Sequence, residues 1–173
     1  MAVVKVSLFN GKHLSCALLT NVKNASHLKK QLLLGKLQCA LIKPTLIVDL
    51  FQLSVAANKS VLLDSQGKLI TKSLYTEVLF NLSISKNISQ SLVKFGIDDT
   101  DTELIMLSFS DDSDVANILM QIEGDIVKLD KLKDFTNQSA VSKAYKINDS
   151  ELSVSSLIDL VASKISTKDF VNV

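Results

Sequence analysis

Alternating apolar and polar residues mark the N-terminal part of the chain. The run V-K-V-S-L-F predicts a strand over residues 3–9, and a second β-like run covers residues 15–22. The N-G-K-H segment at residues 10–13 lies between the two runs and has the composition of a tight turn. The N-terminal part is therefore expected to form a β-hairpin.

Helical spacing of the apolar residues follows the hairpin. We expect a helix over residues 25–34, with Asn24 as its N-cap and Gly35 as its C-terminal stop. Further helices are expected over residues 73–82, 88–95, 114–122, 139–145 and 151–163.

The only proline marks the start of the longest predicted helix. Pro44 suits a first helical turn, where its missing N–H would have no partner, so we expect a largely buried helix over residues 45–60. Its buried face should carry residues at helical spacing, namely Leu46, Ile47, Leu50, Phe51, Ser54 and Ala57. Residues 65–68 then interrupt the helical pattern.

Two later apolar runs, over residues 103–110 and 125–129, predict further strands. The pattern as a whole predicts the α+β class, with a small, mainly antiparallel sheet of about four strands packed against several helices. The chain contains no internal repeat and no low-complexity linker. We therefore expect a single domain over residues 1–173.

Composition narrows the classes of function. The 173 residues are 47% hydrophobic, which is enough for a full core. No uncharged apolar run reaches the ~18 residues that a membrane-spanning helix needs, so we expect no membrane partner. The 19 basic residues are all lysine and face 18 acidic residues, which excludes a polycation and any arginine clamp on phosphate. Cys16 and Cys39 lie in apolar stretches and are expected in the core.

Candidate catalytic and metal-binding residues are few. His13 falls in the predicted turn and His27 on the polar side of a helix, away from any nucleophile pattern. The acidic runs at residues 98–101 and 111–114 lack calcium-loop spacing, and we interpret them as a solvated loop and a helix N-cap. The sequence has no HExxH, CxxC, GxSxG or phosphate-binding glycine loop. We therefore expect no catalysis by this chain, no cofactor and no metal.

Residues 55–97 carry the features that point to binding. Two short helices there offer more apolar positions than one core face needs, namely Tyr75, Val78, Leu79, Leu82, Ile88 and Leu92. This surplus fits a helical protein-binding surface. The same stretch is rich in lysine, with Lys59, Lys68, Lys72, Lys86 and Lys94 opposed by Asp64 and Glu77. These lysines form either a phosphate-contacting patch or a solvated face, and on charge alone the solvated face is the simpler interpretation.

An ordered set of short segments resembles one known family. Along the chain these are V-K-N-A at residues 22–25, I-K-P-T-L-I-V-D at 42–49, V-A-A-N-K at 55–59, T-E-V-L-F-N-L-S at 76–83, N-I-S at 87–89, K-F-G-I at 94–97 and S-T-K-D at 166–169. Together they resemble the kinase-binding subunit of the KEOPS/EKC complex, the TPRKB family. The likeness is densest over residues 42–97 and fades between residues 110 and 134.

The resemblance implies an adaptor without an active site. The family's complex installs a threonylcarbamoyl group on the adenosine beside the anticodon of certain tRNAs. Other subunits carry the chemistry, namely a transferase and a small atypical kinase that acts as an ATPase. The family's subunit binds the N-lobe of that kinase and supports its activity, and archaeal members hold the single-stranded CCA end of tRNA. By this resemblance the chain would act in the cytoplasm and nucleus and meet the other subunits indirectly.

The resemblance also suggests which residues meet each partner. Because the family's kinase-facing surface is helical and apolar, the expected kinase-binding residues are Tyr75, Leu79, Leu82, Ile88 and Leu92. The expected tRNA contacts are Asn58, Lys59, Lys68 and Lys72, with bases splayed onto nearby apolar groups. Two alternatives stay open: a kinase-binding scaffold without nucleic-acid contact, and a small stand-alone enzyme.

Overall fold

Short strands and helices make up the computed structural model, which describes residues 2–171. The strands are β1 (Val4–Ser7), β2 (His13–Thr20), β3 (Ala40–Ile42), β4 (Leu104–Ser108) and β5 (Asp125–Val127). The helices are α1 (Ala25–Leu33), α2 (Leu50–Ser65), α3 (Leu74–Leu82), α4 (Ile88–Phe95), α5 (Asp112–Met120), α6 (Gln138–Ala144), α7 (Asp149–Leu152) and α8 (Leu157–Ser166). Short 3₁₀ turns are η1 (Phe9–Gly11), η2 (Pro44–Leu46), η3 (Leu129–Asp134) and η4 (Lys168–Phe170). Within residues 2–171 the helices are all too short or too polar to span a bilayer.

The strands pair into one antiparallel sheet of five strands, which confirms the predicted α+β class. Their order is β1-β2-β4-β3, and β5 pairs with β2 beyond the end of β1. Consecutive residues of β2 point to opposite faces, so Cys16 and Leu18 pack in one apolar cluster while Ala17 and Leu19 pack in another. The sheet therefore separates two hydrophobic cores.

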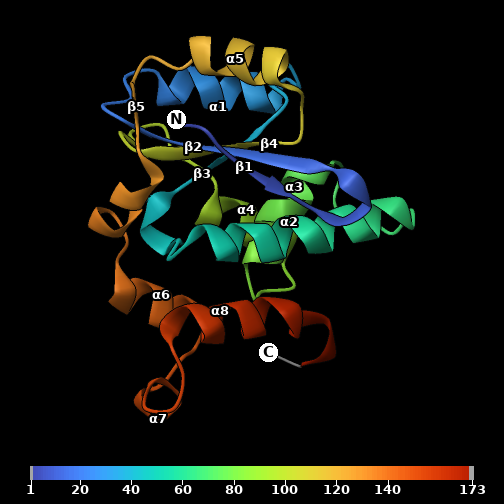
Figure 1. Ribbon diagram of the computed structural model, residues 1–173, viewed down its shortest axis with the longest axis vertical. Helices are drawn as coiled ribbons and strands as arrows, with labels where there is room; N and C mark the ends of the chain where they lie inside the picture. Colours follow the sequence, from blue (N-terminus) through green and yellow to red (C-terminus); the bar gives the residue numbers. More distant parts are fainter. Residues whose placement is uncertain (1, 172–173) are drawn as a thin grey trace.

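Helices cover both faces of this sheet. Figure 1 shows α1 and α5 on one face and α2, α3 and α4 on the other. The C-terminal helices α6, α7 and α8 form a further layer, in which α8 packs against α2. The polypeptide thus places α3 and α4 between the sheet and the C-terminal layer, close to both.

The sequence pattern missed strand β3. Residues Ala40–Ile42 are buried on both faces, so the strand shows no apolar–polar alternation that could reveal it. The outer edge of β3 is also covered, because the backbone N–H of Lys43 donates to the Phe95 carbonyl at 2.8 Å and that of Ile97 donates to the Leu41 carbonyl at 3.3 Å. The end of α4 therefore closes this edge of the sheet.

The longest helix begins later than predicted. Pro44 starts only the 3₁₀ turn η2, and α2 begins at Leu50, where the Asp49 side chain accepts a hydrogen bond from the Phe51 N–H at 2.8 Å. The Gln52 side chain turns inward and bonds to backbone groups of the preceding turn. This start rotates the predicted buried face: Gln52 is fully buried, whereas Phe51 is 51% exposed.

The C-terminal layer also differs from the prediction in detail. The helix expected over residues 151–163 is two helices, because Asn148 caps α7 and Ser156 separately caps α8. The layer is attached to the rest of the fold by Tyr145, whose buried hydroxyl donates to the Leu82 carbonyl at 2.5 Å. That carbonyl belongs to the last turn of α3, so the C-terminal layer grips the end of this helix.

Candidate functional site

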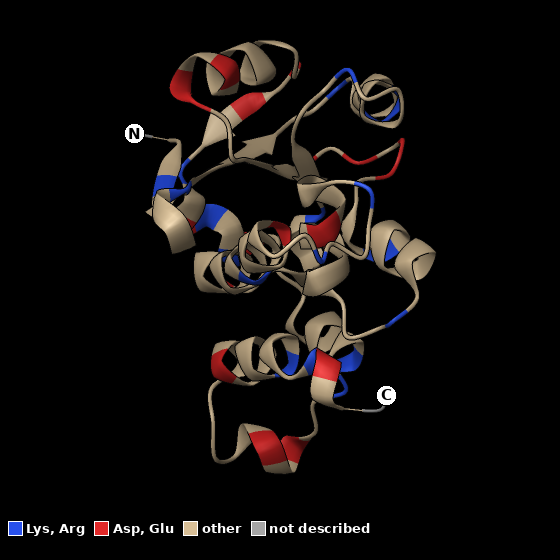
Figure 2. Cartoon of the chain, turned by 90° about the vertical axis from the view of Figure 1, so that its right-hand side faces the viewer, with Lys and Arg blue, Asp and Glu red and all other residues tan. Residues whose placement is uncertain are grey.

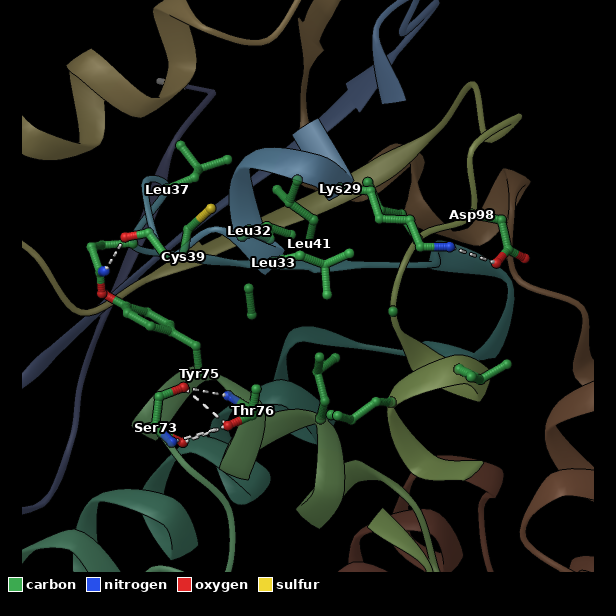
Figure 3. Close-up of a pocket in the computed structure, with 18 residues that line it drawn as sticks. Lys29, Leu32, Leu33, Leu37, Cys39, Leu41, Ser73, Tyr75, Thr76 and Asp98 are labelled. Atoms are coloured by element: carbon green, nitrogen blue, oxygen red, sulfur yellow. Dashed lines mark hydrogen bonds and ion pairs between the residues drawn. The ribbon is translucent and has the colours of Figure 1, made fainter. Parts of the chain in front are cut away.

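An apolar groove lies between α1, β3 and the helix pair α3–α4, with a volume of about 450 Å³ (Figure 3). Its walls come from four separate segments and are mostly apolar. The apolar lining residues are Leu32, Leu33, Leu37, Cys39, Ala40, Leu41, Tyr75, Leu79, Leu92, Val93 and Ile97. The size and the apolar lining are typical of a binding site.

Local signals in the sequence build the lower wall of the apolar groove. The Ser73 side chain begins α3 as part of a capping box, and Asn87 caps α4. Tyr75 and Leu79 are four residues apart, so they share the face of α3 that lines the groove. Leu92 reaches the same groove from α4. The two caps therefore decide which side chains of these helices meet there.

Apolar side chains are left uncovered at the rim of the groove. Leu33 is 81% exposed and Val93 is 69% exposed, and both line the groove. Leu34, the next residue after α1, is 57% exposed. Large exposed apolar side chains gathered at a groove are typical of a protein-interaction site.

Charged residues at one end of the groove compensate each other. The Lys43 ammonium lies 2.5 Å from one carboxylate oxygen of Asp98, and the Lys29 ammonium lies 3.8 Å from the other. The hydrogen bond from Lys43 lowers the pKa of Asp98, with the charges of Lys43 and Lys29 acting in the same direction. Because these charges are paired within the chain, binding in the groove would depend on apolar contact.

The groove holds little reactive chemistry. Burial raises the pKa of the Cys39 thiol to about 12, so the thiol stays protonated and unreactive at neutral pH. The part of the chain that the structure describes contains no group of three or more His, Cys, Asp or Glu side chains placed to hold a metal ion. The arrangement therefore suits recognition of a partner.

The fold divides the five residues that were expected to bind a kinase. Tyr75, Leu79 and Leu92 line the apolar groove together. Ile88 lies at the start of α4 and is 36% exposed. Leu82 is fully buried in the core, because the C-terminal layer covers the end of α3, so its side chain is removed from any surface.

Sequence reasoning missed the upper wall of the groove. Leu32 and Leu33 of α1 line it. Val93 of α4, on the lower wall, was missed as well. A signal was present, because the leucine run at residues 32–34 is wider than the single apolar face of an amphipathic helix. Its partner across the groove was not visible, since it lies more than forty residues away in sequence.

The residues expected to contact tRNA are also separated by the fold. The Asn58 side chain accepts a hydrogen bond from the backbone of η1 at 2.8 Å. The Lys59 ammonium lies 2.9 Å from the Asp169 carboxylate, and its side chain is only 14% exposed. Lys68 and Lys72 are exposed in the segment between α2 and α3. The fold therefore uses Asn58 and Lys59 internally and leaves Lys68 and Lys72 on the surface.

Comparisons with known proteins point to one family. The family model described as Kinase binding protein CGI-121 matches residues 19–169, which include the whole groove. EKC/KEOPS complex subunit TPRKB of Danio rerio is 35% identical over 167 residues, covering 95% of this chain and 95% of that protein. EKC/KEOPS complex subunit cgi121 of Aspergillus fumigatus is 30% identical over 141 residues (76% and 75%). EKC/KEOPS complex subunit CGI121 of Candida glabrata is 29% identical over 168 residues (93% of each).

Proposed function

This chain belongs to the family of the kinase binding protein CGI-121, and from that premise we propose that it is a non-catalytic subunit of an EKC/KEOPS complex. In this role it binds the small atypical kinase of the complex. The kinase acts as the ATPase. This chain provides a docking surface that supports the activity of the kinase. The names of the relatives support membership of the complex, and the description of the family supports kinase binding.

The apolar groove is the observation that carries this proposal. It presents Leu33, Leu79 and Val93 to solvent between two helical walls, a shape that suits an apolar helix or loop of a partner. Each Å² of apolar surface removed from water contributes roughly 25 cal/mol before the costs of association. Burial of Leu33 and Val93 at the rim should therefore contribute most to the free energy of binding the kinase.

The chemistry of the described residues supports a non-catalytic role. His13 and His27 are exposed on different elements, β2 and α1. Cys16 and Cys39 are buried, and burial raises the pKa of each thiol to about 12. A nucleophile needs an adjacent base or a lowered pKa, and these groups have neither arrangement.

We include tRNA recruitment as a second role of the subunit, for threonylcarbamoylation of the adenosine beside the anticodon. The competing function is a kinase-binding scaffold that makes no nucleic-acid contact. Salt dependence separates the two, because lysine–phosphate contacts weaken steeply with salt, whereas an apolar contact responds little. The complex of this chain with the kinase should retain RNA at low salt and release it at high salt if the subunit recruits tRNA.

Capture of the cognate kinase by the purified chain tests the kinase-binding role. We expect the wild-type chain to form a stable pair and Leu79→Glu to lose it, because a carboxylate in the groove would be buried without a partner. Leu33→Glu probes the same groove with little risk to folding, since Leu33 is 81% exposed. Met120→Glu on α5, at a position 77% exposed, is the matched control and should pair normally.

The outcomes separate the function from its location. Failure of the wild-type chain to pair with the kinase would overturn the proposed function. Normal pairing by both groove variants, with a native circular dichroism spectrum, would keep the function and exclude the apolar groove as its surface. Loss of pairing by Met120→Glu alone would move the surface to α5.

A further inference from the structure

A second cavity lies beyond the C-terminal end of α3, against the C-terminal layer. Its volume is about 290 Å³. Its lining residues are Ile84, Tyr145, Lys146, Lys164, Thr167, Lys168 and Val171. Three of these seven side chains are lysines, and Figure 2 shows the blue lysine segments gathered around α8 near the C-terminal end. We call this cavity the lysine pocket.

Lys168 is the unusual member of the lysine pocket, because only 2% of it is exposed. Its ammonium donates to the Phe80 carbonyl at 2.5 Å and lies 3.3 Å from the centre of the Phe80 ring. An ammonium has three N–H donors, and this carbonyl uses one of them. The nearest sequence neighbour with a carboxylate, Asp169, pairs instead with Lys59. Among residues 2–171, the direct partners of this buried cation are thus a ring and a single carbonyl, while the Asp169 and Glu77 carboxylates act on it from farther away.

The other two lysines differ in how well they are compensated. The Lys164 ammonium lies 3.1 Å from the Glu151 carboxylate. Lys146 makes no ion pair with any of residues 2–171. Its backbone has a φ of 53°, in the left-handed region where glycine and asparagine are usual. The fold therefore holds an unpaired lysine at the pocket in a conformation that most residues avoid.

Further lysines raise the positive charge around the pocket. Burial lowers the pKa of Lys168 to about 8, and the charges of Lys59 and Lys86 act in the same direction. The carboxylates that oppose the five lysines are Asp169 and Glu77, which face Lys168, and Glu151, which pairs with Lys164. Among the residues that the structure describes here, five lysines face three carboxylates, so an anion would find compensation at the pocket.

We infer that the lysine pocket binds a phosphate group. Lys146 and Lys164 line the pocket together with Thr167, so two ammonium groups and a hydroxyl are available to oxygen atoms of the ligand. The chain has no arginine, so lysine point charges are the cationic means it has of binding phosphate. The volume of about 290 Å³ is sufficient for a phosphate with part of the group that carries it.

The phosphate can come from two sources with the same chemistry, inorganic phosphate or the backbone of a single-stranded oligoribonucleotide. Phe170 precedes Val171, a lining residue of the pocket, in the sequence and is 87% exposed. An exposed aromatic ring beside lysines is the combination that binds single-stranded nucleic acid, because bases stack on the ring while phosphates meet the charges. For the oligoribonucleotide the inference rests on the proposed tRNA role, and it assigns that role to this pocket in place of Lys68 and Lys72.

Titration of the full chain with each probe, followed by amide NMR shifts, tests the inference. We expect sodium phosphate and a short single-stranded oligoribonucleotide each to shift amides around Ile84, Lys146 and Thr167. Lys146→Asn removes one charge and suits the left-handed backbone, so it should fold normally and weaken binding about tenfold. Lys72→Asn makes the same charge change at an exposed site outside the pocket and should leave affinity unchanged.

The arms of the experiment distinguish the possible results. Tighter binding of the oligoribonucleotide, weakened by Phe170→Ala, supports the pocket with RNA as the source of phosphate. Binding of both probes with no effect of Phe170→Ala supports the pocket with free phosphate as the source. Equal losses in Lys146→Asn and Lys72→Asn, or no binding at all, would overturn the inference. Kinase capture by Lys146→Asn stays normal in every case if the proposed kinase-binding role holds.

Discussion

The apolar groove and the lysine pocket lie against the same helix, α3, and are built from opposite chemistry. Tyr75 and Leu79 present apolar surface to the groove, whereas the Phe80 ring and carbonyl hold the buried ammonium of Lys168. Adjacent residues of a helix point about 100° apart, so Leu79 and Phe80 serve different neighbours. One nine-residue helix can therefore carry an apolar surface on one side and bind a cation on another.

The two regions also differ in what water does to them. The groove leaves Leu33 and Val93 largely exposed, so it gains free energy when a partner removes them from water. The pocket has already buried a charge, so it gains when an anion compensates that charge. We therefore expect partner binding at the groove to be insensitive to salt and ligand binding at the pocket to be sensitive to it.

A substitution in each region should give the largest and most selective effects on binding. Leu79→Glu should weaken kinase pairing at least ~100-fold, because it places a charge in an apolar contact, and should leave phosphate binding unchanged. Lys146→Asn should weaken phosphate binding about tenfold and leave kinase pairing unchanged. Both affinities can be measured for both variants by isothermal titration calorimetry. Loss of both affinities in either variant would mean that the two regions form one site.

Weakening the attachment of the C-terminal layer, which lines the pocket, should lower the stability of the fold. Tyr145→Phe leaves the Leu82 carbonyl and one bond of the Gln52 amide unsatisfied in the core, so it should lower the free energy of unfolding by about 2 kcal/mol. Urea denaturation measures this change. Tyr75→Phe is the matched control, because the Tyr75 hydroxyl makes only long contacts of 3.4–3.5 Å, and its effect should be smaller. A larger effect in the control would contradict this account of how the layer is attached.

Salt should sharpen the contrast between the regions. If the pocket neutralises two phosphates of a single strand, raising salt from about 0.05 M to about 0.5 M should weaken oligoribonucleotide binding roughly 20-fold. Kinase pairing through the groove should change little over the same range, because Asp98 and its lysines are already paired within the chain. Fluorescence anisotropy and pull-down in a salt series measure the two responses. Equal salt dependence would contradict the assignment of charge to one region and apolar contact to the other.

The buried ammonium should give a smaller effect that depends on pH. Burial, with the charge of Lys59, lowers the pKa of Lys168 from 10.5 to about 8, while the unfolded chain keeps the ordinary value. Between these values the unfolded state binds more protons, so this group makes the folded state more stable as pH rises. Relative to Lys168→Met, wild-type stability should rise by on the order of 1 kcal/mol from about pH 8 to about pH 10.

Urea denaturation of the two proteins across this pH range measures the difference. Other titrating groups, including the buried Tyr145, are common to both proteins and cancel in the comparison. A stability difference that stays flat with pH would show that Lys168 titrates normally. Bound phosphate should raise the pKa of Lys168, and so reduce the pH dependence, because the anion stabilises the charged form.

Local signals explain where the sequence pattern predicted the fold well. The helices expected over residues 73–82 and 88–95 are α3 and α4 within one residue, because Ser73 and Asn87 cap them through bonds that reach only three residues along the chain. Gly35 ends α1 in the same local way, with a φ of 69° that suits glycine. Such signals can be recognised from residues that are close together in the sequence.

Distant contacts explain where the pattern failed. Residues 45–49 were expected to be helical, but the Thr136 hydroxyl donates to the Ile47 carbonyl at 2.6 Å and the Asn137 N–H donates to the Thr45 carbonyl at 2.9 Å. These partners lie about ninety residues away and hold the segment open until Asp49 starts α2. Lys59 was expected to contact tRNA from an exposed patch. Its ammonium instead forms an ion pair with Asp169, more than one hundred residues later in the sequence.

The sequence by itself determined the caps of the helices, the excess of apolar positions on α3 and α4, and the use of lysine as the only permanent cation. Only the tertiary structure decided that Leu33 of α1 completes a groove with Leu79, and that Lys146 and Lys168 share a pocket. The physical reason is the distance along the sequence between the residues that interact. Caps and helical faces depend on hydrogen bonds and spacing within a few residues, whereas both sites depend on the packing of elements that are distant in sequence.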